Sequence, residues 1–430
     1  MKRKITQQLI QWKNSPSRKP LILNGARQVG KTFILREFGR EHYKNTVYVN
    51  LESNGIVASM FNDDISPSKL IKYLEAETRE KILPNDTLII LDEIQSCERA
   101  VTSLKYFCEE TPEYHIAAAG SLLGVAINRN QTSFPVGKVN MLRLYPMDFK
   151  EFLTATGNNL LADEITDCYN KMTPMNEALH KKALGLYHDY LIVGGMPEAV
   201  KVFIETNSYI DTGLVQRSII DNYTADMAKY ASNSEAVKIR ACYNSIPAQL
   251  AKDNKKFQYK VVQKGGSSTI FGASLEWLKQ AGVTLECQRA EQGIHPLPVY
   301  ADQTSFKIYM SDVGLLVNKS QMSVNTIITG EANIFMGAVT ENYIAQQLAA
   351  KNYSLYYWTT SNSQAELDFV LQKDDKIYAI EVKKGEHVRS RRLSVFKQKF
   401  SPDYAIRFSQ KNFGRTEDVI SIPLYAAFLI

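Results

Sequence analysis

The sequence predicts a multidomain α/β protein, and three observations favour this fold class. The chain has 430 residues, enough for several domains at about 150 residues each. Over residues 1–150, short apolar segments alternate with helical patterns, which is typical of a parallel sheet with helices on both faces. A long helical stretch follows, and strand-like segments return after residue 320.

The composition excludes several classes of protein. Hydrophobic residues make up 44% of the chain and charged residues 22%, so we exclude a chain disordered throughout, a collagen-like repeat and a disulfide miniprotein. The five cysteines are scattered without a C-x-x-C pair, which favours a reducing compartment. No apolar run reaches the roughly 18 residues of a membrane span, and no signal peptide is evident. We therefore expect a cytoplasmic protein without a membrane partner.

Four domains are expected in order along the chain. Residues 1–150 are predicted to be an α/β core, and residues 151–232 a helical lid that is broken by glycines and a proline at 193–198. Short helices followed by two strands make residues 233–320 suitable for a winged-helix-like connector. Residues 321–430 are predicted to be a second α/β domain.

The apolar patterns also predict individual elements. Strands of the first domain are expected at residues 21–23, 47–49, 88–91 and 116–119. Its helices are expected at 32–38 and 66–82, and further helices at 239–252, 271–281 and 337–351. Strands of the later domains are expected at 283–288, 307–310, 355–358, 367–371 and 377–382.

A phosphate-binding loop follows the first strand. Residues 25–32 read GARQVGKT, which fits G-x-x-x-x-G-K-[ST] between a strand and a helix. Glycines let the backbone turn tightly, so that its N–H groups and the helix N-terminus face phosphate oxygens. Lys31 would reach the β- and γ-phosphates, and Thr32 would offer its hydroxyl to Mg²⁺. We therefore predict that ATP and Mg²⁺ bind here, with the nucleotide held by Gly25, Ala26, Arg27, Gln28, Val29, Gly30, Lys31 and Thr32.

Acidic residues at the end of another strand complete this site. Asp92 and Glu93 follow the apolar run LIIL, and ligands bind beyond the carboxyl ends of parallel strands. Asp92 would hold Mg²⁺, and Glu93 would be the catalytic base that orients or deprotonates water, alongside Lys31 at the phosphates. Ser121, after the strand HIAAAG, would lie between the two motifs and contact the γ-phosphate, although a plain turn residue is the alternative.

A second set of polar residues lies near the C-terminus. Alternation along the strands puts Asp368 on one face of AELDFVL, and Glu381 and Lys383 on one face of IEVK. If these strands form a hairpin, the three side chains converge, and two carboxylates at one point favour Mg²⁺ or Mn²⁺ between them. Lys383 could then activate a water for attack on a phosphodiester, and Glu341 on the preceding helix could be a further metal ligand. The alternative is a polar strand face with solvated charges.

The charge distribution indicates a polyanionic partner for this domain. The whole chain has a net charge of +6, whereas residues 383–415 alone contain ten Lys or Arg and only two acidic residues. A basic surface beside a metal site suits a nucleic-acid backbone, so DNA is the expected partner. A solvated basic helix face is the alternative.

Nine segments together give the chain a family resemblance. They are GARQVGKT, LDEIQ, AAAGS, LYPMDFKEFL, VGGMPEAV, KIYMSDVGLL, GAVTENYIAQQL, AELDFVL and IEVKKG. With them the chain resembles the prokaryotic AAA-type ATPases that carry a C-terminal domain of unknown function related to PD-(D/E)XK nucleases. The resemblance implies nucleotide and Mg²⁺ contacts at the residues named above, γ-phosphate sensing at Ser121, and a restriction-endonuclease-like C-terminal fold. For that fold it implies metal ligands Glu341, Asp368 and Glu381, with Asp368, Glu381 and Lys383 as the catalytic set.

One departure from the family concerns an arginine. Such proteins often have Gly-Arg shortly before the L-x-P-x-x-F segment, whereas this chain has Gly137-Lys138. Lysine keeps the charge but loses the planar fork, so no arginine finger is assigned.

These expectations combine into one functional hypothesis. The chain would bind and hydrolyse ATP and would bind or act on DNA through its nuclease-like domain, with a second Mg²⁺ or Mn²⁺ there. The alternative is an ATP-dependent regulatory switch that docks a protein, with the nuclease-like domain inactive. A homo-oligomer is left open, and the sequence names no protein partner, DNA structure or biological process.

Overall fold

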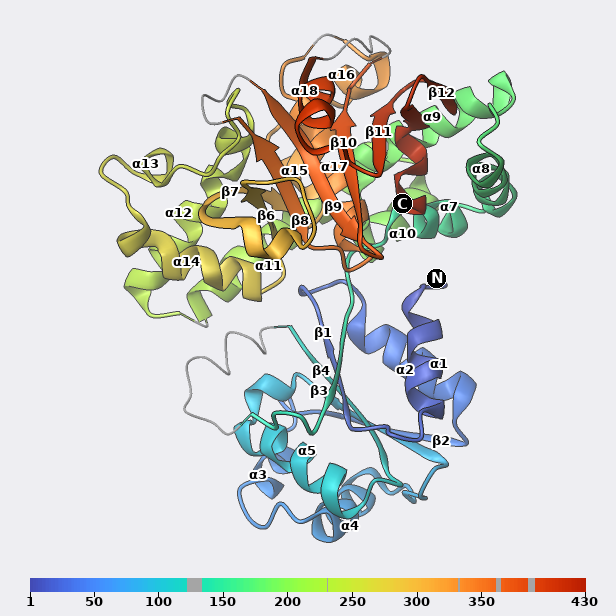
Figure 1. Cartoon of the computed structure of the whole chain (residues 1–430). Coiled ribbons are helices and arrows are strands. Elements are labelled where there is room, and N and C mark those ends of the chain that lie inside the picture. Colours follow the sequence, from blue (N-terminus) through green and yellow to red (C-terminus); the bar gives the residue numbers. More distant parts are fainter. Residues whose placement is uncertain (122–133, 230, 332, 361–364, 386–390) are drawn as a thin grey trace. The chain divides into compact units, whose positions relative to one another are not determined.

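The structure is a computed structural model that describes residues 1–121, 134–229, 231–331, 333–360, 365–385 and 391–430 (Figure 1). The chain divides into two compact units. The N-terminal unit is Met1–Tyr145 with Gln280–Gly282, and the C-terminal unit is Pro146–Lys279 with Val283–Ile430.

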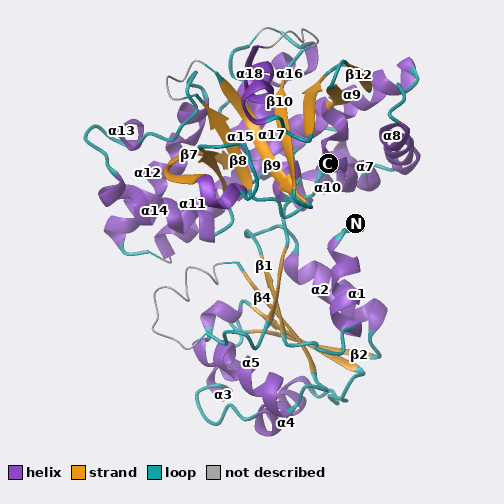
Figure 2. Ribbon diagram, viewed as in Figure 1, coloured by secondary structure: helices purple, strands orange, loops and turns teal. Residues whose placement is uncertain are grey.

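A five-stranded parallel sheet forms the centre of the N-terminal unit (Figure 2). Its order is β2-β3-β4-β1-β5, which confirms the predicted parallel-sheet core. The strands are β1 (Leu21–Asn24), β2 (Asn45–Asn50), β3 (Thr87–Asp92), β4 (His115–Gly120) and β5 (Asn140–Arg143). The helices are α1 (Ile5–Asn14), α2 (Lys31–His42), α3 (Gly55–Met60), α4 (Pro67–Thr78) and α5 (Glu98–Glu110). The helix predicted over 66–82 ends early because Arg79 is left-handed, with φ 60°.

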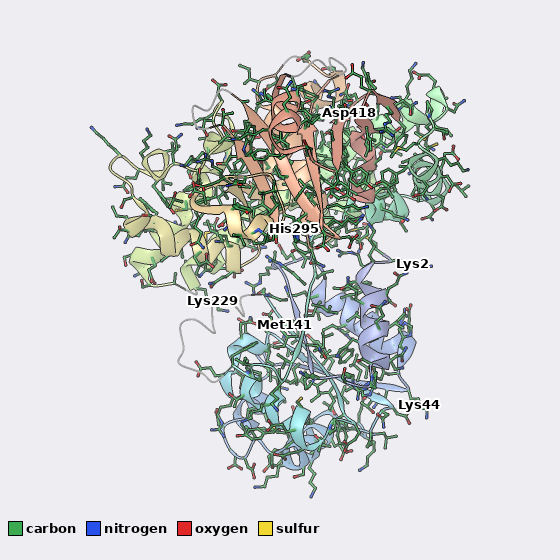
Figure 3. The ribbon with its side chains drawn as sticks, in the orientation of Figure 1. Lys2, Lys44, Met141, Lys229, His295 and Asp418 are labelled. Atoms are coloured by element: carbon green, nitrogen blue, oxygen red, sulfur yellow. The ribbon has the colours of Figure 1, made fainter. Side chains whose placement is uncertain are left out.

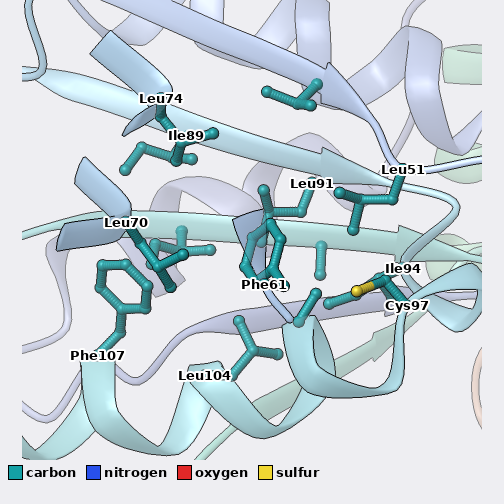
Figure 4. Close-up of a cluster of buried hydrophobic side chains, with 14 of the residues drawn as sticks. Leu51, Phe61, Leu70, Leu74, Ile89, Leu91, Ile94, Cys97, Leu104 and Phe107 are labelled. Carbon is teal, nitrogen blue, oxygen red and sulfur yellow. The ribbon is translucent and has the colours of Figure 1, made fainter. Parts of the chain in front are cut away.

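Apolar side chains hold helices against this sheet (Figure 4). Ile89 and Leu91 of β3 lie in one buried cluster with Leu104 and Phe107 of α5. Every residue of β3 is buried, as expected for a central strand covered on both faces. The strand therefore delivers Asp92 at a fixed position at the edge of the sheet.

The C-terminal unit contains an eight-stranded mixed sheet of order β12-β13-β11-β10-β9-β8-β6-β7. The strands are β6 (Thr284–Ala290), β7 (Ala301–Met310), β8 (Leu355–Thr359), β9 (Glu366–Lys373), β10 (Lys376–Val382), β11 (Tyr404–Ser409), β12 (Gly414–Thr416) and β13 (Val419–Pro423). Antiparallel pairing of β9 with β10 confirms the predicted hairpin. Because β6 also pairs with β8, the strands of the predicted winged-helix-like segment continue the sheet of the last domain. The divisions within this unit stay predictions.

Helices make up the rest of the C-terminal unit. They are α7 (Phe149–Ala155), α8 (Asn159–Lys171), α9 (Glu177–Val193), α10 (Pro197–Thr206), α11 (Tyr209–Lys229), α12 (Asn233–Leu250), α13 (Tyr259–Val262), α14 (Ser268–Gln280), α15 (Val313–Lys319), α16 (Val324–Thr329), α17 (Met336–Ala349) and α18 (Arg391–Phe400). Helix α17 packs on β6, β7, β8 and β10 and is buried along nearly its whole length. Charged side chains lie on the surface of each unit. Lys44 before β2 and Asp418 between β12 and β13 are two exposed examples (Figure 3). Among the described residues, no helix is long and apolar enough to cross a membrane.

Asp312 joins two of the sequence motifs in the C-terminal unit. Its side chain is fully buried and accepts the backbone N–H groups of Gly195, at 2.6 Å, and Leu315, at 2.9 Å. A Cβ atom at Gly194 would lie 2.2 Å from Asp312 Oδ1, so VGGMPEAV needs its first glycine here. Burial raises the pKa of Asp312 to about 6. The carboxylate thus fixes the α9–α10 turn to the start of α15.

We predict that Asp312→Ala destabilises the C-terminal unit by at least about 2 kcal/mol, because two buried N–H groups lose their acceptor. The measurement is denaturant unfolding followed by tryptophan fluorescence in a Trp12→Phe background. The other tryptophans, Trp277 and Trp358, both lie in the C-terminal unit, so the signal reports on that unit alone.

The matched control is Asp163→Ala, since Asp163 is an exposed acid on α8. Its effect should stay within about 0.5 kcal/mol. Equal losses for the two variants would contradict the role given to Asp312.

Candidate functional site

The phosphate loop connects β1 to α2 with a backbone that glycine makes possible. Gly25 has φ 150°, and a Cβ atom there would lie 2.2 Å from the carbonyl oxygen of Leu144. Gly30 has φ 94° and is the residue before the first turn of α2. The loop therefore brings the free N–H groups of a helix N-terminus to its centre, as phosphate binding requires.

Lys31 is buried within this loop. Its side chain is 8% exposed, and Nζ donates to the carbonyl oxygens of Gly25, at 2.9 Å, and Ala26, at 2.8 Å. An ammonium group is costly to bury without such partners. The contacts hold the charge inside the loop, where phosphate oxygens are expected to bind.

Thr32 and Asp92 are joined by a hydrogen bond. Thr32 Oγ1 donates to Asp92 Oδ2 at 2.8 Å, so the hydroxyl and carboxylate that would hold Mg²⁺ lie together. Tyr48 on β2 donates its hydroxyl to the same carboxylate oxygen at 2.9 Å. Sequence reasoning missed Tyr48, and the available signal was its place on the neighbouring strand, where it pairs with Ile90.

Glu93 directly follows Asp92 in a left-handed backbone conformation, with φ 50°. Its Oε2 accepts a hydrogen bond from the side-chain amide of Gln95, which the sequence did not indicate. Ser121 is 3% exposed and follows β4, which lies between β3 and β1. The sheet order therefore brings Lys31, Glu93 and Ser121 to the same edge.

Three further basic residues make contacts in the N-terminal unit. Arg3 donates to the carbonyl oxygens of Val29, at 3.0 Å, and Tyr145, at 2.7 Å. Arg27 of the loop lies 4.0 Å from Glu52. Lys138, which stands where the family often has arginine, forms a surface ion pair with Glu109 at 2.9 Å.

The residues present fit a magnesium nucleotide. Carboxylate and hydroxyl oxygens suit Mg²⁺, and backbone N–H groups with a lysine suit phosphate. The packing at Gly25 supports this fit. A side chain there would clash with the carbonyl oxygen of Leu144, so the loop can keep its phosphate-binding shape only with glycine.

In the C-terminal unit, Glu341 of α17 is buried among cations. Its Oε1 contacts Lys255 Nζ, and its Oε2 lies 3.9 Å from Lys307 Nζ and 3.3 Å from the Tyr309 hydroxyl. Burial alone would raise the pKa of Glu341, but Lys255 and Lys307 outweigh it and lower the pKa. The carboxylate is therefore ionised although it is only 6% exposed.

Lys307 is completely buried. Its side chain is 0% exposed, its Nζ lies 2.6 Å from Glu366 Oε1, and it is 4.7 Å from the centre of the Tyr357 ring. Burial by itself would lower the pKa of Lys307, but Glu366 and Glu341 outweigh it and raise the pKa. Lys307 therefore stays protonated, and its positive charge lies between Glu341 of α17 and Glu366 of β9.

Asp368 lies between this group and the second strand of the hairpin. Oδ2 accepts the backbone N–H of Val382 at 2.7 Å, and the side chain is 4% exposed. Burial, with a further contribution from the charge of Glu341, raises the pKa of Asp368. The charge of Glu341 thus disfavours ionisation of Asp368.

Glu381 and Lys383 form a neighbouring ion pair on β10. Glu381 Oε1 lies 3.1 Å from Lys383 Nζ, and its Oε2 accepts a hydrogen bond from Arg407 Nε at 3.0 Å. Arg407 on β11 is directly opposite Glu381 in the sheet. Sequence reasoning missed Arg407, Lys255 and Lys307.

These positions do not fit a second metal ion as they stand. Within the described residues, no three His, Cys, Asp or Glu side chains lie close enough together to hold a metal. Lysines and an arginine already balance Glu341 and Glu381. The assignment of Glu341, Asp368 and Glu381 as metal ligands stays a prediction.

A polar cavity of about 360 Å³ opens beside this group. Its lining includes hydroxyl groups of Ser305, Tyr357, Thr359 and Thr360, and it also includes Asp253, Asn254, Lys256, Arg289, Glu366 and Arg392. Glu366 is the direct link, because it is shared between the cavity and Lys307. Cations from three separate segments therefore meet at one cavity.

Comparison with known proteins bears on the N-terminal unit first. Residues 17–153 match the family described as "AAA domain". The matched range contains the phosphate loop, Asp92, Glu93 and Ser121. It supports an AAA-type ATPase function, with nucleotide as the bound cofactor. Residues 184–326 and 336–425 match two domains of unknown function, DUF8612 and DUF4143.

Several solved structures are similar over most of the chain. The Walker-type ATPase PABY2304 of Pyrococcus abyssi is 15% identical, with a TM-score of 0.45, over 74% of this chain and 95% of that chain. The ORC2 protein of Aeropyrum pernix, in ADPNP–ADP complexes, is 12% identical, with a TM-score of 0.33, over 78% and 91%. The Aeropyrum pernix ORC1 protein in complex with DNA is 10% identical, with a TM-score of 0.28, over 76% and 91%. No curated protein matches the chain.

We predict that Lys31→Ala lowers ATP turnover at least about 100-fold, because it removes the only lysine within the phosphate loop. Steady-state phosphate release measures turnover, and thermal melting checks folding. Lys44→Ala is the matched control, since Lys44 is exposed and pairs with Asp86 at the surface. Turnover retained by Lys31→Ala would contradict the site.

Glu93→Gln separates binding from hydrolysis in the same assay. The amide keeps the shape of the side chain but cannot take a proton, so nucleotide binding should persist while turnover stops. Loss of nucleotide binding would mean that Glu93 has a different role.

Proposed function

We propose that the chain is an ATP-hydrolysing AAA-type protein that binds DNA through its C-terminal unit. The N-terminal half of the proposal rests on the family match and on the pairing of Thr32 with Asp92. The C-terminal half rests on one observation, the polar cavity beside the buried carboxylates, which is lined by Lys256, Arg289 and Arg392.

At the ATP site, each residue has a defined task. The loop N–H groups and Lys31 bind the phosphates, and Ser121 contacts the γ-phosphate. Thr32 and Asp92 would hold Mg²⁺, which would supply positive charge to neutralise the phosphate oxygens. Glu93 orients the attacking water and accepts its proton, while Gln95 holds the Glu93 carboxylate in place. Tyr48 fixes the Asp92 carboxylate from the other side.

On the C-terminal unit, the cavity supplies what a phosphodiester backbone needs. Lys256, Arg289 and Arg392 bring positive charge to its wall, and the hydroxyls of Ser305 and Thr360 can donate to phosphate oxygens. Further exposed cations, Lys384, Lys399, Lys411 and Arg415, lie within residues 383–415. This distribution favours a nucleic acid over a neutral small molecule.

Cleavage of DNA is the finer part of the hypothesis. The nuclease-like set is Asp368, Glu381 and Lys383, with Glu341, and the hairpin brings Asp368 next to the backbone of β10. Because cations of the chain already balance Glu341 and Glu381, binding is better supported than cleavage. A role as a protein-docking switch is the competing outcome, and the oligomeric state is left open.

We predict that the protein binds duplex or single-stranded DNA with an affinity that falls steeply with salt, and that Arg392→Ala weakens binding to all sequences alike. Loss of one phosphate contact should reduce the salt slope, the change in log affinity with log salt concentration, by about one. Fluorescence anisotropy with labelled oligonucleotides over a range of NaCl concentrations measures both quantities.

Arg217→Ala is the matched control, because Arg217 is exposed on α11 and does not line the cavity. Its affinity and salt slope should equal those of the unchanged protein. Absence of DNA binding even at low salt would remove the nucleic-acid half of the proposal and favour the protein-docking switch.

A further inference from the structure

Arg3 is a buried cation that contacts the phosphate loop, although it lies at the start of the chain, two residues before α1. It is 8% exposed. Its Nη1 donates to the carbonyl oxygen of Val29 at 3.0 Å, and its Nη2 donates to the carbonyl oxygen of Tyr145 at 2.7 Å. A guanidinium is costly to bury without such acceptors, so the side chain and the two carbonyl groups hold one another in place.

The two acceptors of Arg3 belong to opposite sides of the loop. Val29 lies near the end of the loop, whereas Tyr145 follows Leu144, whose carbonyl oxygen packs against Gly25 at the start of the loop. The planar fork of an arginine serves two acceptors at once, which a single ammonium group does less well. Arg3 therefore ties the end of the loop to the segment that supports its start.

The contact with Val29 also sets the direction of a peptide group. Among the described residues, the one cis peptide bond is His295-Pro296, so the bond between Val29 and Gly30 is trans. In a planar trans peptide the carbonyl and the following N–H point in opposite directions. Because Arg3 holds the Val29 oxygen, the Gly30 N–H points away from Arg3. This N–H lies at the N-terminus of α2, where loops of this kind bind phosphate.

The conformation of Gly30 explains why this peptide needs to be held. Gly30 has φ 94°. Glycine accepts positive and negative φ almost equally well, so the residue itself does not prevent the preceding peptide from turning over. In the turned orientation a carbonyl oxygen would face the phosphate, and the donor would be lost. A loop that spends part of its time in that orientation binds nucleotide more weakly, in proportion to the fraction that is competent.

We propose that Arg3 is a positioning residue for the nucleotide, which keeps the Val29–Gly30 peptide in the orientation that donates to phosphate. This inference rests on the proposed ATP site, and it extends that site to a residue outside GARQVGKT. Arg3 acts through the backbone and does not touch the nucleotide. Its loss should therefore lower nucleotide affinity, while bound ATP should still be hydrolysed, because Thr32, Asp92 and Glu93 keep their places.

The experiment compares Arg3→Ala with the unchanged full chain in two assays. Steady-state turnover over a range of Mg²⁺-ATP concentrations gives kcat and KM, and displacement of methylanthraniloyl-ADP by ADP gives a binding constant directly. We expect KM and the Kd of ADP to rise at least about tenfold, with kcat within about threefold of the unchanged protein. Lys2→Ala is the matched control, because Lys2 is a neighbouring exposed cation, and its KM and Kd should not change.

Arg3→Lys separates positioning from folding. It keeps a buried cation but lacks the fork, so the Kd of ADP should rise about threefold or more, less than in Arg3→Ala. Thermal melting of the nucleotide-free proteins reports on folding alone. A merely structural role for Arg3 would lower the melting temperature and leave the Kd of ADP unaltered in the folded variants.

Three outcomes would overturn the inference. They are an unchanged Kd of ADP in folded Arg3→Ala or Arg3→Lys, a fall in kcat without a rise in KM, or an equal loss of affinity in Lys2→Ala. Failure of the proposed function is a different result, since the unchanged protein would then show no ATP turnover.

Discussion

The carboxylate of Glu341 is almost completely buried, and groups of the chain itself must balance its charge. An isolated buried charge costs several kcal/mol, and a pair is tolerated only with good geometry and further hydrogen bonds. Lys307, Lys255 and the Tyr309 hydroxyl meet this requirement, and they tie α17 to β7 and to the α12–α13 loop. The position of the Glu341 carboxylate therefore depends on segments that are far in sequence from the strands that carry Asp368 and Glu381.

The same constraint applies to Lys31 in the N-terminal unit, where the buried group is a cation. Two backbone carbonyls satisfy the ammonium, and both belong to the loop that Lys31 is expected to share with phosphate. Carbonyl oxygens carry only partial charge, so phosphate oxygens can replace them at a gain. In the C-terminal unit the partners are full charges, so an incoming ion must displace one of them. The phosphate loop can therefore exchange its internal contacts for a ligand, whereas the carboxylates of the C-terminal unit are already paired with cations of the chain.

Local patterns were sufficient to predict much of this molecule. The phosphate loop, the apolar strand before Asp92 and the β9–β10 hairpin each depend on residues that are close in sequence. Contacts between residues that are far apart in the sequence were not predictable. Lys255 is 86 residues from Glu341, and Tyr48 is 44 residues from Asp92. Nothing in the spacing of such residues distinguishes a buried counter-charge from a solvated lysine, so the lysines beside Glu341 could not be predicted.

The proposed function puts ATP hydrolysis and DNA binding in one chain, so we expect the two activities to be coupled. The most direct test is steady-state ATP turnover of the full chain at saturating Mg²⁺-ATP, measured while DNA is titrated at low salt. The proposal predicts that turnover changes with DNA concentration and levels off at the concentration that saturates binding in anisotropy. Turnover that stays constant while DNA binding saturates would contradict it, since the two units would then act independently.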